Sequence, residues 1–239
     1  MSTKEKIIFS TPEAGEFLTA CGLEDLESVF RLGRAVQPDR HSHKEVASAT
    51  LETKRTRERI FIKRQWRRKR QVPRWGDLIR GQARQSDPVR EWWGLTWLRA
   101  AGLDAAEPLG LYYRTRSMRS AVVTRAVPAA TSFHDMLRAG SQERAAVESL
   151  EPLAEAVALT VRRMHAAGYA WRGVVARHFY PEIRPDSSWR VWLIDLEGVH
   201  RRLSPLSIRR DHRRLLESLK GFDIDPEMSR LLATKLGKR

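Results

Sequence analysis

Two charged residues in the first half of the chain have the types and the order that phosphate binding requires. Lys63 closes the apolar stretch "IFIK", which predicts an ammonium group at the end of a β-strand. Glu91 lies further along, in "REWWGLTWL", whose apolar residues recur at helical spacing. A strand lysine followed by a helix carboxylate could form the ion pair that presents a lysine to phosphate groups. Each residue alone also fits an ordinary solvated position, so only the combination indicates this chemistry.

Asp195 and His178 have side chains that could bind a metal ion. Asp195 follows the apolar stretch "VWLI", where a carboxylate is costly to bury unless it meets a cation such as Mg²⁺. His178 lies in "ARHF", at the offset from Gly173 where a loop of the H-R-D-x-x-x-x-N type carries a metal or phosphate ligand. The alternatives are a carboxylate that caps the next turn and a packed structural histidine.

The segment "YAWRGVVARHF" lies where a phosphotransferase would carry its catalytic base. Arg172 suits a positioning role there, although the chain is rich in arginine. The position of the base itself is occupied by Gly173, which has no side chain. The carboxylates of Glu182 and Asp186 follow closely enough in the sequence to be alternative bases.

These residues need a scaffold, and the hydrophobic pattern predicts one in two parts. In the first half we expect helices over 11–22 and 87–102 and strands over 28–36, 45–52, 59–66, 107–116 and 119–127. In the second half we expect helices over 132–140, 145–168, 208–222 and 225–237 and one strand over 189–196. The pattern therefore predicts an α+β fold with a helical extension (1–27), a β-rich N-lobe (28–127) and a helical C-lobe (128–239).

Composition limits the class of protein and its partners. The chain has 239 residues, enough for two small lobes with a core, and 41% of them are hydrophobic, as in globular proteins. Its formal net charge of +15 favours anionic partners such as nucleotides, nucleic acid or a membrane surface. The single cysteine, Cys21, rules out an intrachain disulfide and fits a reducing cytoplasm. We find no signal peptide or spanning segment, and therefore expect a soluble or peripherally bound protein.

A basic run from Arg64 to Arg74, with Trp66 and Trp75 nearby, is a candidate surface for an anionic partner. It is nominally a solvated connector. We favour a membrane or glycolipid over nucleic acid, because no helix-turn-helix, RNA-recognition or zinc signature accompanies it.

An ordered set of segments, "IFIK", "REWWGLTWLRAAGLDAAEPLGL", "AVVTRAV", "VRRMHAAGYAWRGVVARHF", "VWLIDLEGVHRR" and "RRDHRRLLESL", resembles the bacterial lipopolysaccharide core kinases of the Kdo/heptose kinase group. The resemblance runs from about residue 28 to about residue 220. It implies a protein-kinase-like fold that uses ATP and Mg²⁺ to phosphorylate inner-core sugars. It also implies a cytoplasmic location, peripheral to the inner membrane.

The resemblance assigns a role to individual residues. Lys63 would be the phosphate-binding lysine, with Glu91 as its ion-pair partner. Asp195 would bind magnesium, and His178 lies where the family commonly has a histidine. Asp211 resembles a structural aspartate of a late helix.

The chain departs from the family in its catalytic loop. Where the family reads H-R-D, this chain has Trp171, Arg172 and Gly173. The missing aspartate is the general base or the group that orients the attacking hydroxyl, and losing such a group typically costs about 10²–10⁴-fold in rate. The region of the glycine-rich phosphate cover contains only Gly33. An active sugar kinase, a catalytically inactive pseudokinase and, as a third alternative, a basic nucleic-acid-binding protein remain open.

Overall fold

The computed structural model describes residues 4–39, 43–54, 56–66, 85–114, 119–138, 150–201, 204–220 and 226–237, with backbone only over 34–39. The chain divides into two compact units. Unit 1 comprises Met1–Thr96 and Glu107–Ala126, and unit 2 comprises Trp97–Ala106 and Val127–Arg239. Unit 1 is built on a sheet and unit 2 is mainly helical, so the predicted α+β class is confirmed.

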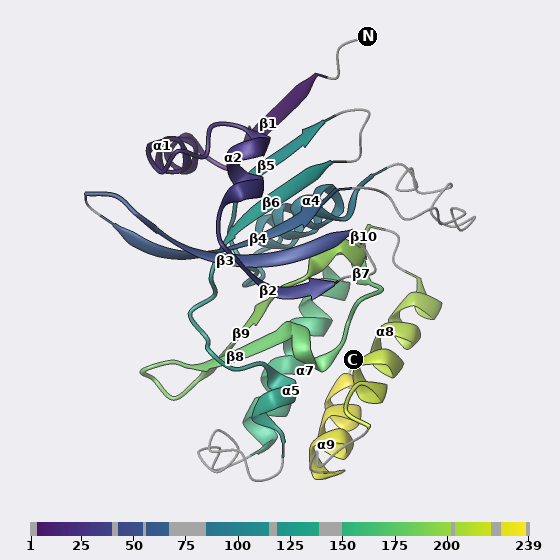
Figure 1. Cartoon of the computed structure of the whole chain (residues 1–239). Helices are drawn as coiled ribbons and strands as arrows, with labels where there is room; N and C mark the ends of the chain where they lie inside the picture. The colour runs from purple at the N-terminus through teal and green to yellow at the C-terminus, as the bar shows by residue number, and fades with distance from the viewer. Residues whose placement is uncertain are drawn as a thin grey trace. The chain divides into compact units, whose positions relative to one another are not determined.

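Unit 1 contains a six-stranded antiparallel sheet in the order β1-β5-β6-β4-β3-β2 (Figure 1). Its strands are β1 (Glu5–Phe9), β2 (Arg34–Asp39), β3 (Lys44–Glu52), β4 (Arg57–Gln65), β5 (Pro108–Arg114) and β6 (Ser120–Arg125). Two of them, β5 and β6, lie inside segments that the sequence predicts as strands, and β3 and β4 overlap predicted strands but begin one and two residues earlier. The central position of β4, between β3 and β6, is what places Lys63 inside the sheet.

Two local predictions in unit 1 are wrong. The strand β1 was not predicted, because residues 1–27 read as a helical extension; it pairs with β5, so its stability depends on a partner far along the chain. The predicted strand over 28–36 begins instead with helix α2 (Leu26–Arg31). Asp25 caps this helix by accepting a hydrogen bond from the backbone N–H of Ser28, whose hydroxyl completes the capping box.

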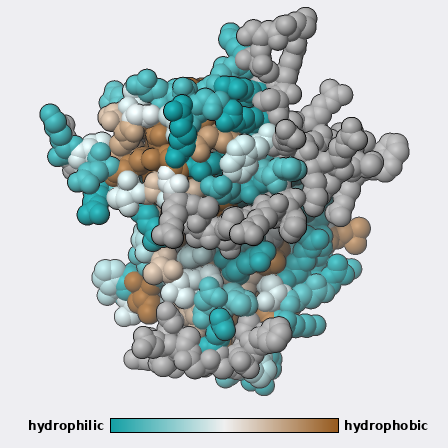
Figure 2. Space-filling view, viewed as in Figure 1, coloured by the Kyte–Doolittle hydropathy of each residue, from teal (hydrophilic) through white to brown (hydrophobic). Residues whose placement is uncertain are grey.

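One face of the sheet packs against α1 (Pro12–Ala20) and α2. Thr11 caps α1 and Pro12 is its first residue, as the sequence predicts. Buried residues of both helices and of β3 to β6 form one core cluster, which includes Leu18, Leu26, Ile60, Ile62 and Val123. Partly buried residues such as Phe17 and Leu32 pack against this cluster. Figure 2 shows hydrophobic surface near α1 and α2.

The other face of the sheet packs against the first part of α4 (Asp87–Ala100). Trp92 of this helix forms a small core cluster with Leu111 and Val122. Gly102 ends the helical segment in the left-handed conformation, with φ of 76°, and the N–H of Leu103 returns to the carbonyl of Leu98. This is the stop that the sequence predicts.

Unit 2 is organised around α7 (Leu150–Ala166), whose apolar side is buried. The other helices are α5 (Phe133–Met136), α8 (Pro205–Glu217) and α9 (Pro226–Gly237). Two short antiparallel strand pairs accompany them, β7 (Ala170–Trp171) with β10 (Val199–His200) and β8 (Phe179–Ile183) with β9 (Trp189–Leu193). Single 3₁₀ turns, η1 (Ala176–His178) and η2 (Leu196–Gly198), follow β7 and β9. Over the described residues, we find no helix with the length and hydrophobicity needed to cross a bilayer.

Candidate functional site

Lys63 and Glu91 form the ion pair that the sequence predicts. The Nζ atom of Lys63 lies 2.5 Å from Oε2 of Glu91, and the two side chains are 14% and 9% exposed. Lys63 lies within β4 rather than at its end, opposite Val46 of β3 and Val122 of β6. Because side chains alternate along a strand, Ile60, Ile62 and Arg64 point to the opposite face. The ion pair is therefore held by a paired strand and not by a mobile strand end.

The start of α4 is fixed to the sheet, and this places Glu91 opposite Lys63. The backbone N–H of Asp87 donates to Oε1 of Gln65 in β4, at 2.8 Å. The hydroxyl of Ser120 in β6 donates to that of Ser86, at 2.7 Å. Asp87 also pairs with Lys44 of β3 and with Arg90. The helix start is thus tied to three strands, and Glu91 follows one helical turn later.

In unit 2, the segment that contains Arg172 and Gly173 is held by backbone hydrogen bonds. Trp171 pairs with Val199 across β7 and β10. The N–H of Arg172 donates to the carbonyl of Gly198 at 3.2 Å, and the carbonyl of Arg172 accepts from the guanidinium of Arg214 in α8. A Cβ atom on Gly198 would lie only 3.0 Å from the N of Gly173. This close approach explains why the turn after Asp195 ends in a glycine.

His178 connects Gly173 to Asp195. Its Nδ1 lies 2.9 Å from the carbonyl oxygen of Gly173, and its Nε2 lies 3.2 Å from Oδ2 of Asp195. Because a carbonyl oxygen only accepts, Nδ1 carries the proton. Nε2 then has two chemical options: as part of an imidazolium it donates to Asp195, or as an unprotonated nitrogen it offers a lone pair beside the carboxylate. The second arrangement is a pair of metal ligands.

Asp195 lies just after β9 and begins the turn η2. The predicted strand over 189–196 ends earlier, at Leu193, and Asp195 has a left-handed backbone with φ of 56°. An aspartate tolerates this conformation better than most residues. Its side chain is 35% exposed, so the expected cost of burying the carboxylate is smaller than the sequence suggested.

The fully buried carboxylate of Asp211 in α8 anchors the segment that contains Arg172 and Gly173. Its Oδ2 accepts from the backbone N–H of Trp171 at 2.8 Å and lies 3.3 Å from Nε2 of His165, and its Oδ1 accepts from Arg210 at 2.7 Å. Burial raises the pKa of this carboxyl, but these hydrogen bonds and the Arg210 charge outweigh it and leave the pKa below its ordinary value. The structural role implied for Asp211 agrees with this geometry.

The two alternative carboxylates are engaged elsewhere. Glu182 of β8 accepts from Nε1 of Trp192 in β9, at 2.8 Å. Asp186 lies in the exposed turn between these strands, where it accepts from the N–H and the hydroxyl of Ser188. Both side chains form hydrogen bonds within the β8–β9 pair, which gives no support to either as a base.

Three residues that hold the segment from Trp171 to His178 were not predicted from the sequence: Gly198, Arg214 and Ser218. The hydroxyl of Ser218 accepts from the N–H of Ala176 at 2.8 Å. The glycine in the short turn between "LID" and "VH" was a usable signal. The roles of Arg214 and Ser218 depend on the packing of α8 and leave no local signal.

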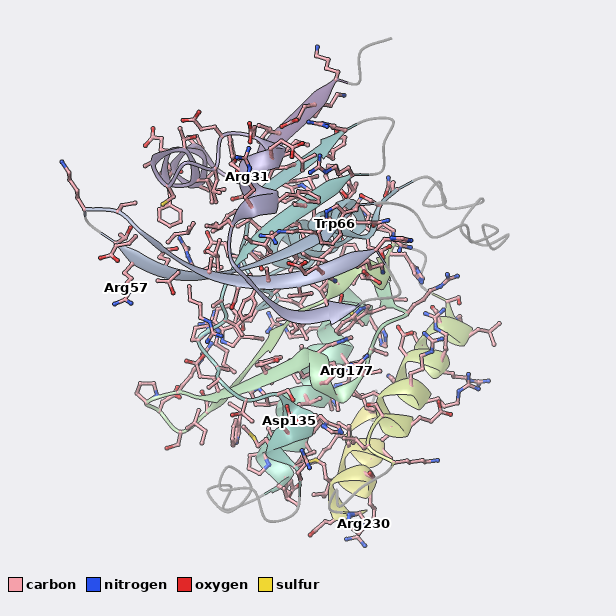
Figure 3. The ribbon with its side chains drawn as sticks, in the orientation of Figure 1. Arg31, Arg57, Trp66, Asp135, Arg177 and Arg230 are labelled. Atoms are coloured by element: carbon pink, nitrogen blue, oxygen red, sulfur yellow. The ribbon has the colours of Figure 1, made fainter. Side chains whose placement is uncertain are left out.

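The predicted basic surface run begins with a residue that is not on the surface. Arg64 is 3% exposed, pairs with Glu45 at 2.9 Å and donates to the carbonyl of Val29. It points into the core because it shares the face of Ile60 and Ile62. Trp66, labelled in Figure 3, is 38% exposed and packs edge-on against Phe30. Residues 67–74 and Trp75 lie outside the described part of the chain.

Gly33, the lone glycine of the expected phosphate cover, has a structural role. Its φ is 84°, and a Cβ atom there would lie 2.8 Å from the carbonyl oxygen of Ser48 in β3. A side chain is therefore excluded by the neighbouring strand, and this glycine gives no indication of a phosphate loop.

Comparison with solved structures identifies the class of fold. The structure of WaaP in complex with acyl carrier protein matches with a TM-score of 0.67 and 17% identity, over 98% of this chain and 89% of that one. An apo pseudokinase structure matches with a TM-score of 0.49 and 15% identity, over 94% of this chain and 88% of that one. The first of these two matches shows that this chain shares the fold of the WaaP structure.

The family follows from the sequence. Residues 42–233 match the lipopolysaccharide kinase (Kdo/WaaP) family, a range that includes every candidate residue from Lys63 to Asp211. The chain therefore belongs to this family. Among curated proteins, no sequence matches it significantly.

Proposed function

We propose that this protein is a lipopolysaccharide core kinase homologue that binds ATP and acts in cell-envelope biogenesis, with strongly reduced phosphotransfer. The observation that supports nucleotide binding is the Lys63–Glu91 pair, held between a central strand and an anchored helix. The observation that supports reduced catalysis is Gly173, which carries no group to accept a proton.

Lys63 is the residue that we expect to bind the nucleotide phosphates. In kinase-like folds, the glutamate orients the strand lysine, and the lysine neutralises phosphate charge. Lys63 is largely shielded from water, which strengthens its attraction to an anion. Lys63, oriented by Glu91, therefore fits the phosphate groups of ATP.

Asp195 and His178 are the residues that we expect to hold Mg²⁺, which would neutralise charge on the phosphates. The partly exposed carboxylate of Asp195 suits this role, because carboxylate oxygen is a ligand that Mg²⁺ prefers, and Nε2 of His178 lies beside it. Arg172 would position the loop mainly through its backbone, which bonds Gly198 and Arg214.

The reaction in question transfers the terminal phosphoryl group of ATP to a hydroxyl oxygen of an inner-core sugar, and the hydroxyl proton must leave. In this chain residue 173 has no acceptor for that proton, while Glu182 and Asp186 are bonded within their own hairpin. The proton would pass directly to solvent or phosphate, which we expect to slow the reaction by about 10²–10⁴-fold.

The acceptor or binding partner would be lipopolysaccharide core or another anionic glycolipid. The formal charge of +15 supports electrostatic attraction to anionic headgroups and to the inner-membrane surface. We therefore propose a cytoplasmic location, peripheral to that membrane.

A phosphotransfer assay tests this proposal. The wild type, incubated with labelled ATP, Mg²⁺ and lipopolysaccharide core oligosaccharide, should transfer label no faster than about 1% of the rate of a family member with an intact H-R-D loop. Asp195→Ala sets the background. Binding of ATP and of the oligosaccharide is measured separately by titration. If the wild type binds neither, the proposal is wrong.

An active sugar kinase is the second candidate. Phosphoryl transfer depends mainly on positioning and electrostatics, and the Lys63–Glu91 and His178–Asp195 pairs are both present. Turnover close to that of an intact relative, abolished by Asp195→Ala, would favour this candidate.

A further inference from the structure

Two of the three residues at the H-R-D position differ from the pattern, and the side chain of the first lies where a side chain on the third would be. Trp171 replaces the histidine and Gly173 replaces the aspartate. We propose that these are one coupled change: the indole of Trp171 excludes a working carboxylate at residue 173. Only the activity measurement described below depends on the proposed function; the stability and NMR measurements do not.

The first reason is steric. A Cβ atom on residue 173 would lie 3.0 Å from Nε1 of Trp171, 3.6 Å from Cδ1 and 3.7 Å from Cε2. The first distance is well inside the usual separation of nonbonded heavy atoms, about 3.5–4.0 Å. Any side chain at residue 173 therefore requires the indole or the loop to shift by a few tenths of an ångström.

The indole is poorly able to move. Trp171 is fully buried, and its ring centroid lies 5.7 Å from those of both His178 and Phe179. Its backbone N–H is held by the buried carboxylate of Asp211. Because both its ring and its backbone are fixed, the strain of a new side chain would fall on residue 173.

The second reason is chemical. Nε1 of Trp171 is buried and makes no hydrogen bond with any described residue. An aspartate at residue 173 would bring a carboxylate within reach of this donor. The resulting charge-assisted bond would lower the pKa of the carboxyl and occupy the oxygen that should accept the proton.

A histidine at residue 171 lacks the benzene ring whose packing fixes the indole. It can turn its ring or present an unprotonated nitrogen, and so leave the carboxylate free. The expected consequence is that Gly173→Asp alone does not restore phosphotransfer, whereas Trp171→His with Gly173→Asp does.

A double-mutant cycle on stability tests the steric step without any ligand. Gly173→Ala adds only the Cβ atom, and should lower the equilibrium constant for folding about tenfold with Trp171 present. With Trp171→Leu, which removes the indole, the same change should have less than about a twofold effect. Gly237→Ala is the matched control, because a Cβ atom there meets nothing within 4 Å, and it should be additive with Trp171→Leu.

Two further measurements test the chemical step. In Gly173→Asp, the Nε1–H resonance of Trp171 in NMR spectra should shift and should follow the titration of the new carboxyl, which it cannot do in Gly173→Ala. Phosphotransfer should exceed the wild-type rate about tenfold or more only in the Trp171→His/Gly173→Asp variant.

Additive stability effects of Gly173→Ala and Trp171→Leu would overturn the steric step. An unchanged indole resonance, or full activity from Gly173→Asp alone, would overturn the chemical one. If no variant binds ATP, the proposed function fails, while the stability and NMR results still decide the coupling of Trp171 and Gly173.

Discussion

Asp211 should be the main anchor of the loop that contains Arg172 and Gly173, and its replacement by alanine tests this. The carboxylate is fully buried and accepts from the backbone of Trp171, from His165 and from Arg210. Asp211→Ala leaves the buried N–H of Trp171 without its acceptor, which costs about 1–3 kcal/mol. The side chains of Arg210 and His165 also lose their bonds, although Arg210 is 24% exposed and can be rehydrated.

We therefore expect Asp211→Ala to lower the free energy of unfolding by about 3 kcal/mol, towards the lower end of the range for breaking a buried charged pair. Asp211→Asn keeps one carbonyl oxygen for the N–H of Trp171 and should cost about 1–2 kcal/mol. Urea unfolding followed by circular dichroism measures both values.

Asp186→Ala is the matched control, because this aspartate is exposed and bonds only within its turn. It should have little effect on unfolding. If Asp211→Ala is no more destabilising than Asp186→Ala, the anchoring role assigned to Asp211 is refuted.

Three smaller predictions concern the same unit. Gly198→Ala should cost about 1–3 kcal/mol by crowding the N of Gly173, measured by urea unfolding; an unchanged midpoint would contradict the close approach. Gly102→Ala should cost about 1 kcal/mol in the same assay, because its φ of 76° favours glycine, and a neutral result would argue against that strain. Burial and the neighbouring His165 lower the pKa of His212 from 6.5, although the Asp211 charge opposes this. The unfolded state therefore binds more protons below about pH 6.5, and stability falls as the pH drops through that value. His212→Gln should flatten this part of the curve of melting temperature against pH, and an unchanged slope would show that other groups cause it.

Features set by local pattern could be predicted from the sequence. The helices around Pro12 and Gly102 follow from cap and stop residues, and the Lys63–Glu91 pair follows from a strand lysine and a helix glutamate in a known order. The order of the elements also sufficed for the resemblance to the lipopolysaccharide kinases.

Features set by distant contacts could not be predicted. Strand β1 depends on β5, and residues 28–31 became helical because Asp25 and Ser28 form a capping box. The sequence pattern predicts that the charged Arg64 is exposed to solvent, yet it lies on the face of β4 that packs into the core. The position of the Trp171 indole beside residue 173 depends on ring packing, which the spacing of residues in the sequence does not reveal.

The central claim is that this protein binds ATP through Lys63 and Glu91. Calorimetric titration with ATP and Mg²⁺ tests it most directly. The test variant is Lys63→Met/Glu91→Gln, which removes both charges so that no lone buried charge remains. The control is Lys54→Met, at an exposed lysine. We predict saturable binding by the wild type and the control, and at least about tenfold weaker binding, about 1.4 kcal/mol, by the paired variant. No binding by the wild type, or equal binding by all three proteins, would contradict the account.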